Sequence, residues 1–178
     1  MKTLLKPAIV TILWCLSIAT VQAADELDER VKAALESSEI KFTETESHNV
    51  RAEFSTTEDR TNLVFINSDT QKDGEYEHRE VWAVACSIGD VESTNYSANR
   101  SEGYHYHELL ARLMSRNSGN QTGGFKLVRD SENRGKSLIV YSAIVPADAS
   151  GELLKSVMDA CAFNADNLEK EWTMKDKH

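Results

Sequence analysis

The chain has 178 residues and a formal net charge of −9, from 29 acidic and 20 basic side chains. Nucleic acids and anionic lipid surfaces bind proteins through basic patches that replace counterions, so this charge disfavours both as partners. A basic polypeptide, or no charged partner at all, fits the composition better.

Residues 1–23 have the pattern of a secretory signal peptide. Two lysines precede an apolar segment over 8–21, and small residues stand at the cleavage positions minus three and minus one. The apolar segment is shorter than the roughly twenty residues that span a bilayer comfortably. We therefore expect cleavage between Ala23 and Ala24, with a retained membrane anchor as the alternative. The mature protein would be periplasmic or secreted and would no longer contact the membrane.

The mature chain, residues 24–178, is expected to form a single domain. Cleavage removes 23 residues, which include two basic side chains and no acid, and leaves 155 residues with 18 basic side chains, 29 acids and a formal charge of −11. This length is enough for one domain with a substantial core and not for two.

The first part of that domain predicts a helix followed by short strands. Residues 25–38 carry apolar side chains at helical spacing, with acids near the start that favour the helix dipole. The segments 40–46 and 50–54 alternate as strands do and form either one broken strand or two short ones.

Two denser strands are predicted next. The segments 61–67 and 79–88 have the apolar content of interior strands, and we expect them to pair antiparallel. Asp73 and Gly74, inside the long polar connection between them, are typical of a hairpin turn.

A long polar segment separates these strands from an amphipathic helix. Residues 89–103 are mostly Asp, Glu, Ser, Thr, Asn and Arg, and such a surface loop is longer than most connections in compact domains. It is either a plain solvated connection or a functional loop. Residues 104–117 have one apolar stripe at helical spacing, and that stripe must face a core.

A hairpin follows the helix. Glycines 123 and 124 let the chain reverse into a strand over 125–129, and the polar run 131–136 marks the turn to a second strand over 137–145. This second strand is apolar on both faces, which is typical of a central strand with both sides covered.

Asp148 or Ser150 then caps a last helix that has an apolar face. The expected fold is therefore α+β: a single domain in which an antiparallel sheet of about five strands is packed by three helices, in the order α-β-β-β-α-β-β-α.

This order of elements, together with three short sequences, resembles the YbjN-domain family. The sequences are Leu-Leu-Ala-Arg-Leu-Met-Ser-Arg-Asn at 109–117, Gly-Gly-Phe-Lys-Leu at 123–127, and Pro-Ala-Asp at 146–148 after the apolar strand. The resemblance covers about 25–172 and implies the fold of the type III secretion chaperones, often as a dimer, with a regulatory role or one in holding another polypeptide. It transfers no catalytic residues. Secretion chaperones work in the cytoplasm, so the signal pattern argues against an effector-chaperone role.

Cys86 and Cys161 are the cysteines that remain after signal cleavage. In an oxidising compartment, an even pair is a plausible disulfide. Both also fall on apolar faces, where cysteine serves as a small hydrophobic residue, and both interpretations stay open. A catalytic thiol is not indicated, because the chain has no Cys-x-x-Cys motif and no evident partner base.

The densest group of possible metal ligands is His105, His107 and Glu108. A zincin helix needs His-Glu-x-x-His, and here Ala111 stands where the second histidine is needed. On a helix, His105 and His107 point about 200° apart, so they share a metal only if this segment is extended. We interpret them as ordinary residues of a helix start and predict no metal site.

Other catalytic and modification motifs are absent or weak. The chain has no Gly-x-Ser-x-Gly elbow, phosphate-cradling loop or dinucleotide fingerprint, so no catalytic residue and no cofactor are predicted. Asn95, Asn99 and Asn120 begin glycosylation sequons, which matter only in a eukaryotic source.

Three functions fit these observations. The first is a non-enzymatic binding module, regulatory or chaperone-like, that engages another polypeptide or itself as a homodimer through a sheet face, a sheet edge or a helix groove. The second is a metal-dependent or hydrolytic enzyme that uses the 104–108 group under the 89–103 loop. The third is a structural envelope protein stabilised by a Cys86–Cys161 bridge, without a dedicated ligand. The charge, the missing motifs and the family resemblance favour the first.

Overall fold

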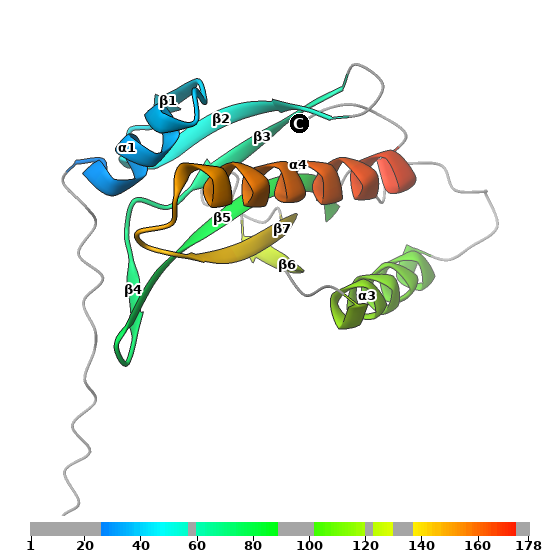
Figure 1. Ribbon diagram of the computed structural model, residues 1–178. Helices are drawn as coiled ribbons and strands as arrows, with labels where there is room; N and C mark the ends of the chain where they lie inside the picture. Colours follow the sequence, from blue (N-terminus) through cyan, green and yellow to red (C-terminus); the bar gives the residue numbers. More distant parts are fainter. Residues whose placement is uncertain (1–25, 57–59, 89–101, 120–122, 130–136, 174–178) are drawn as a thin grey trace, which may run out of the picture.

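The computed structural model describes residues 26–56, 60–88, 102–119, 123–129 and 137–173 (Figure 1). For residues 102–108 it describes the backbone only. Within the described residues the fold is α+β, with three helices and one antiparallel sheet of seven strands. The predicted signal peptide lies outside the described residues. No helix in the described part is long and apolar enough to cross a membrane.

The elements in chain order are α1 (Glu29–Ser37), β1 (Phe42–Glu44), β2 (Val50–Ser55), β3 (Thr61–Ile66), β4 (Gln71–Asp73), β5 (Tyr76–Ser87), α3 (Glu102–Gly119), β6 (Gly124–Arg129), β7 (Ser137–Pro146) and α4 (Gly151–Thr173).

The sheet is organised around β5, its longest strand. The strand order is β1-β2-β3-β5-β7-β6, and the short β4 pairs with the start of β5. Val81 of β5 lies opposite Ile66 of β3 on one side and Ala143 of β7 on the other. A bulge between Val84 and Cys86 shifts the register toward the end of β5.

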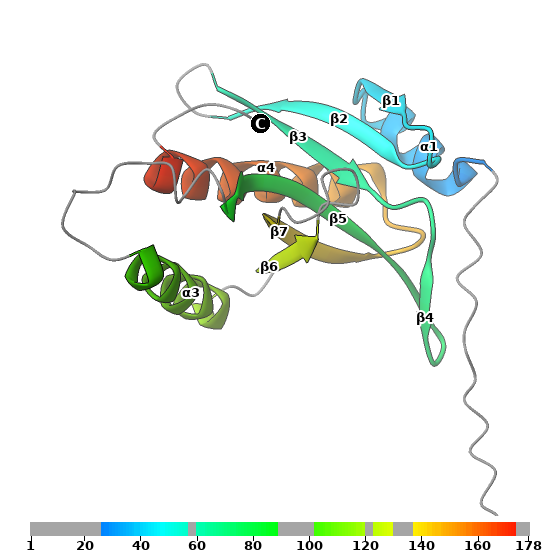
Figure 2. The ribbon, with the colours of Figure 1, turned by 180° about the vertical axis from the view of Figure 1, so that it is seen from behind.

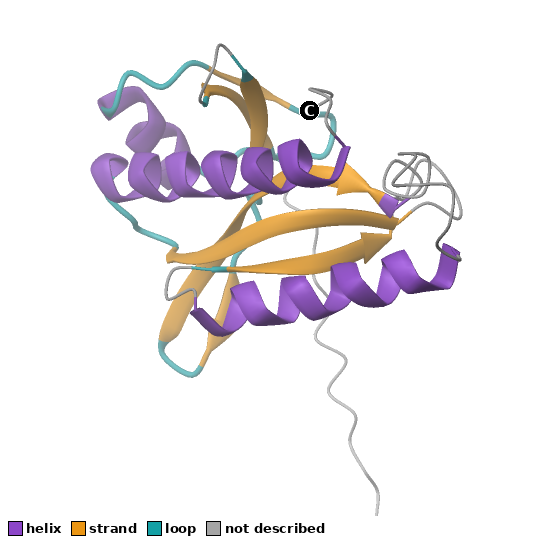
Figure 3. Cartoon of the chain, turned by 90° about the vertical axis from the view of Figure 1, so that its right-hand side faces the viewer, coloured by secondary structure: helices purple, strands orange, loops and turns teal. Residues whose placement is uncertain are grey.

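Helices α1 and α4 cover one face of the sheet, and α3 lies beside the edge strand β6 (Figure 1, Figure 3). Helix α4 packs over β3, β5 and β7, and the end of α1 packs on the start of α4. The core between the two layers contains side chains from all three helices and from the inward positions of the strands: Val31, Leu35, Val64, Ile66, Val81, Ala83, Leu109, Leu113, Tyr141, Leu154, Met158, Cys161 and Leu168.

The predicted strand count was too low for two reasons. The segment 40–54 forms two strands rather than one broken strand, because β1 and β2 fold back antiparallel around a turn in which His48 has a φ of 56°. Strand β4 was not predicted, because Gln71, Lys72 and Asp73 are polar and exposed and lack any apolar alternation. The pairing of β3 with β5 and of β6 with β7 is confirmed as antiparallel.

The hairpin predicted at Asp73 and Gly74 is confirmed. Asp73 pairs with Tyr76, so Gly74 and Glu75 form a two-residue turn, and Gly74 has a φ of 63°. Glycine at the first position of such a turn is typical of type II′ geometry, which matches the twist of paired strands. Strand β5 therefore begins three residues earlier than predicted and extends with β4 beyond the rest of the sheet (Figure 1).

The structure distinguishes the two caps proposed for the last helix and corrects the prediction for β7. The Leu153 amide donates to the Ser150 hydroxyl at 3.3 Å, which makes Ser150 the cap of α4.

In β7, Ile139, Val140 and Tyr141 are all buried, as a strand covered on both faces requires. The prediction fails further along the strand, where Ile144 is 68% exposed.

Candidate functional site

His105, His107 and Glu108, which the sequence analysis considered as possible metal ligands, lie in a helix. Residues 104–108 belong to helix α3, whereas His105 and His107 share a metal only from an extended segment. No group of three His, Cys, Asp or Glu side chains is arranged to hold a metal ion among the described residues. The loop predicted at 89–103 lies outside the described residues apart from the first residues of α3, as do all three sequon asparagines.

Cys86 and Cys161 are both buried thiols, and the structure contains no bond between them. The Cys161 Sγ lies 3.6 Å from the carbonyl oxygen of Val81. Cys86 stands five residues further along the same strand, beyond the bulge. Burial raises the pKa of the Cys161 thiol to about 12. The arrangement supports the interpretation of both cysteines as core residues rather than as a bridge.

The sheet face opposite α1 and α4 is the first candidate interaction surface. No described helix lies over it (Figure 2). We call it the open face and define it by Leu63 and Phe65 of β3, Trp82 and Val84 of β5, and Ile144 of β7. These residues share one face because they alternate along their strands with the buried positions and because Phe65 lies directly opposite Trp82.

An aromatic pair stiffens the centre of the open face. The rings of Phe65 and Trp82 stack with centroids 4.3 Å apart, and the Trp82 indole donates to the Asn67 side-chain oxygen at 3.2 Å. Ile144 extends the apolar surface toward β6 and is largely exposed. Stacked rings anchored by a hydrogen bond form a rigid apolar platform, a type of surface common at protein interfaces.

The charged side chains around the open face balance one another. Lys126 of β6 is paired with Glu80 of β5, two strands away across β7. Arg51 and Glu53 are exposed on the outward side of β2. Charges of both signs therefore lie together on this face, in a chain whose net charge is −9.

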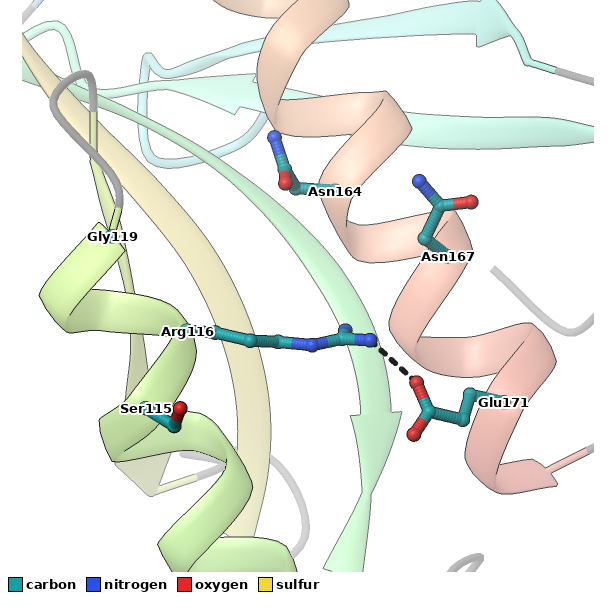
Figure 4. A pocket seen from close by; sticks show the side chains of 6 residues that line it. All are labelled: Ser115, Arg116, Gly119, Asn164, Asn167 and Glu171. Carbon is teal, nitrogen blue, oxygen red and sulfur yellow. Dashed lines mark hydrogen bonds and ion pairs between the residues drawn. The ribbon is translucent and has the colours of Figure 1, made fainter.

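A pocket between α3 and α4 is the second candidate site (Figure 4). Its volume is about 570 Å³, and its lining is polar: Ser115, Arg116, Gly119, Asn164, Asn167 and Glu171. Arg112 and Arg116 lie one helical turn apart on α3, and both donate to the Glu171 carboxylate of α4 at 2.5 Å. Arg112 also lies over the Trp172 ring, 5.9 Å from its centroid. These contacts fix the width of the gap between the helices.

No family model, curated protein or solved structure matches the chain. The functional argument therefore rests on the surfaces of the molecule, and the YbjN-domain resemblance stays a hypothesis.

A buried acid pair on α4 has a structural role. Asp166 and Glu169 are fully buried and both bind the guanidinium of Arg60, at 2.5 and 3.0 Å. This ion pair network joins the residue before β3 to the end of α4. Sequence patterns did not reveal it, because the partners are more than 100 residues apart and charged residues are normally expected at the surface.

Proposed function

We propose that the protein is a non-enzymatic binding module, periplasmic or secreted, whose open face engages a polypeptide, and that its first partner is a second copy of itself. The observation that carries this proposal is the apolar composition of a sheet face that no described helix covers. A solvated face of an antiparallel sheet normally carries polar residues in alternation with the buried apolar ones. In β3 the outward residues are Thr61, Leu63 and Phe65, two of them large and apolar, and one inward residue is the polar Asn62.

The charge balance of the open face supports self-association. Two copies of an acidic chain repel one another at long range, so their contact is most favourable where the local charge is neutral. The Glu80–Lys126 pair and the opposite charges of Arg51 and Glu53 provide such a neutral region around the apolar centre. In a two-fold dimer, each patch meets its own copy, which suits a surface that carries both signs of charge.

The sequence supports the remaining parts of the proposal. The signal pattern at 1–23 supports export, and the resemblance to YbjN-domain proteins supports a role in regulation or in holding another polypeptide. The chain offers no recognised catalytic motif, which is why we propose binding rather than catalysis.

The test compares two equally exposed apolar residues. Ile144 of the open face is 68% exposed and Met114 of α3 is 73% exposed, so an aspartate at either position leaves the core intact. We expect light scattering after gel filtration to give a dimer mass for the wild-type protein and for Met114→Asp, and a monomer mass for Ile144→Asp.

A crosslinked pull-down from the envelope extract of the host tests for other polypeptides with the same two variants. A monomeric wild-type protein that also captures no partner dependent on Ile144 would overturn the proposal. Dissociation by Met114→Asp would move the interface to α3.

A further inference from the structure

The polar pocket between α3 and α4 contains hydrogen-bond donors that no described residue uses. We propose that it binds a carboxylate group, carried either by a small organic acid or by a polypeptide. This proposal does not depend on the open face, because the pocket lies between two helices on the other side of the molecule (Figure 4).

Arg116 is the principal donor of the pocket. Its Nη2 donates to Oε2 of Glu171 at 2.5 Å, and no other hydrogen bond or ion pair of this guanidinium occurs within the described part of the chain. A guanidinium has five N–H donors in a planar fork, so most of the donors of Arg116 stay available. The side chain crosses the gap from α3 to α4 and is partly exposed, which brings these donors to the pocket (Figure 4).

Two further lining residues add donors. The side chains of Ser115 and Asn167 make no hydrogen bond to any described residue, and both line the pocket. The amide nitrogen of Asn164 is already used, because it donates to the Ala160 carbonyl at 2.8 Å. A hydroxyl, an amide and a guanidinium thus line the space with donors that no described residue uses. An ionised carboxylate accepts at both oxygens and donates nothing, so it complements this lining.

The charge of the pocket suits a singly charged ligand. Its lining holds one cation, Arg116, and one acid, Glu171, so it has no excess of positive charge for a doubly charged phosphate. The geometry also suits a carboxylate, because Arg112 and Arg116 already hold the Glu171 carboxylate in the same gap. The volume of about 570 Å³ is in the range of small-ligand sites.

Glu171 is therefore a built-in competitor of the ligand. It holds the arginines between the helices while the pocket lacks a ligand, and it shares Arg116 with any carboxylate that enters. Neutralising Glu171 should strengthen binding, whereas neutralising Arg116 should weaken it. A residue that only supports the fold would not produce these opposite effects.

The experiment is an NMR titration of the whole protein with three probes. The probes are sodium acetate, N-acetyl-diglycine with its free carboxylate, and the same peptide with an amide in place of the carboxylate. We expect saturable shifts of the Arg116 Nε–H and Asn167 side-chain signals with the first two probes and none with the amide. Equal affinity for the two carboxylates indicates a small-acid ligand, and tighter binding of the peptide indicates a polypeptide carboxylate.

Three variants complete the test. We expect Arg116→Gln to weaken carboxylate binding about tenfold or more, because a charge-assisted hydrogen bond is lost. Lys72→Gln, which removes an exposed cation of β4 away from the pocket, is the control and should leave binding unchanged. Glu171→Gln should bind more tightly than wild type, and this result decides the question if Arg116→Gln does not fold. The proposal is overturned by shifts that do not saturate, by equal binding of the amide peptide, or by weaker binding in Glu171→Gln.

Discussion

Arg79 lies buried in β5 at 1% exposure, and its Nη2 donates to the Asp28 carboxylate at 2.8 Å. The same carboxylate caps helix α1, because its Oδ1 accepts from the Arg30 amide at 2.8 Å. Arg79 also donates to the carbonyl oxygens of Ser68 and Ala147, at 3.1 and 3.0 Å. A single carboxylate thus orders the start of α1 and neutralises a cation inside the sheet layer.

Replacing Asp28 by Asn should therefore destabilise the fold strongly. The amide still caps α1, but the Arg79 charge stays buried without its carboxylate. We expect a loss of about 2 to 3 kcal/mol in the free energy of unfolding, which is less than a fully buried ion pair loses when it is broken, because Asp28 is partly solvated. Urea denaturation measures this loss. The neighbouring Glu29→Gln is the control, since its side chain is largely exposed, and an equal effect in both variants would contradict the account.

The same network predicts that acid weakens the fold. Burial raises the pKa of the Asp28 carboxyl, but hydrogen bonds from Arg30 and Arg79 outweigh it and hold the pKa well below its usual range. Hydrogen bonds from Arg30 and Thr70 lower the pKa of Glu77 to about 2. A carboxyl with a depressed folded-state pKa stabilises the fold above its unfolded pKa of about 4. That contribution is lost as the pH falls from about 4 through about 2.

The measurement is the free energy of unfolding between neutral pH and pH 2, for the wild type and for Asp28→Asn. We expect a plateau at neutral pH and a decline on acidification in the wild-type protein, with a shallower decline in the variant because one of the depressed groups is gone. Identical slopes in the two proteins would show that other carboxyl groups dominate the acid response.

The sequence predicts those parts of the fold in which buried apolar residues recur at regular spacing. Strands β3 and β5 and helices α3 and α4 were predicted because apolar residues recur at the spacing of their buried faces. Strand β4 was missed because pairing beyond a tight turn creates it without burial. Arg79 stands at an inward position of β5. A charged residue inside an apolar pattern does not reveal which residue it pairs with, so the sequence did not predict its contact with Asp28.

The candidate sites are less predictable because their partners are distant in the chain. Arg116 and Glu171 are 55 residues apart, and neither belongs to a local motif. The sequence predicts an amphipathic helix over 104–117, but it does not predict the pocket, which forms only where α3 and α4 come together. For the open face, β3 and β5 were predicted as interior strands from their apolar density, and β7 as a strand covered on both faces. The structure shows that helices α1 and α4 cover only one of those sides (Figure 2).

Gly151 is required where α4 meets α1. A Cβ atom at this position would lie 2.4 Å from the Ala34 carbonyl oxygen and 2.1 Å from the Ser38 hydroxyl. The backbone oxygen cannot rotate away, so Gly151→Ala must push the two helices apart, with an expected loss of about 1 to 3 kcal/mol. Gly119→Ala is the matched control, because that helical glycine has open space around it and alanine favours helices. Thermal unfolding compares the two, and equal midpoints would contradict this packing.

Buried Cys161 should resist both alkylation and oxidation. Its thiolate is scarce because burial raises the pKa of the thiol to about 12, and the thiolate is the reactive form. We expect Cys86→Ala protein, which keeps Cys161, to take up iodoacetamide only after denaturation. Mass measurement of the unreduced wild-type protein should give the mass of two thiols. A native protein lighter by two hydrogens would instead show a Cys86–Cys161 bridge and a rearrangement of α4 on the sheet.

Asn117 attaches the end of α3 to the edge strand β6 and should not tolerate a carboxylate. Its Oδ1 accepts from the Phe125 amide at 2.7 Å, and its Nδ2 donates to the Phe125 carbonyl at 2.9 Å. The side chain thus makes the two hydrogen bonds that the backbone of a neighbouring strand would make. Asn117→Ala loses both bonds and should cost about 1 to 2 kcal/mol. Asn117→Asp keeps the acceptor but directs a negative oxygen at the Phe125 carbonyl. At neutral pH this variant should be at least as unstable as Asn117→Ala. Its stability should recover toward that of the wild type when the carboxyl is protonated. Urea denaturation at neutral and acid pH separates the two variants. An Asp variant as stable as wild type at neutral pH would mean that this side chain does not hold α3 against the strand.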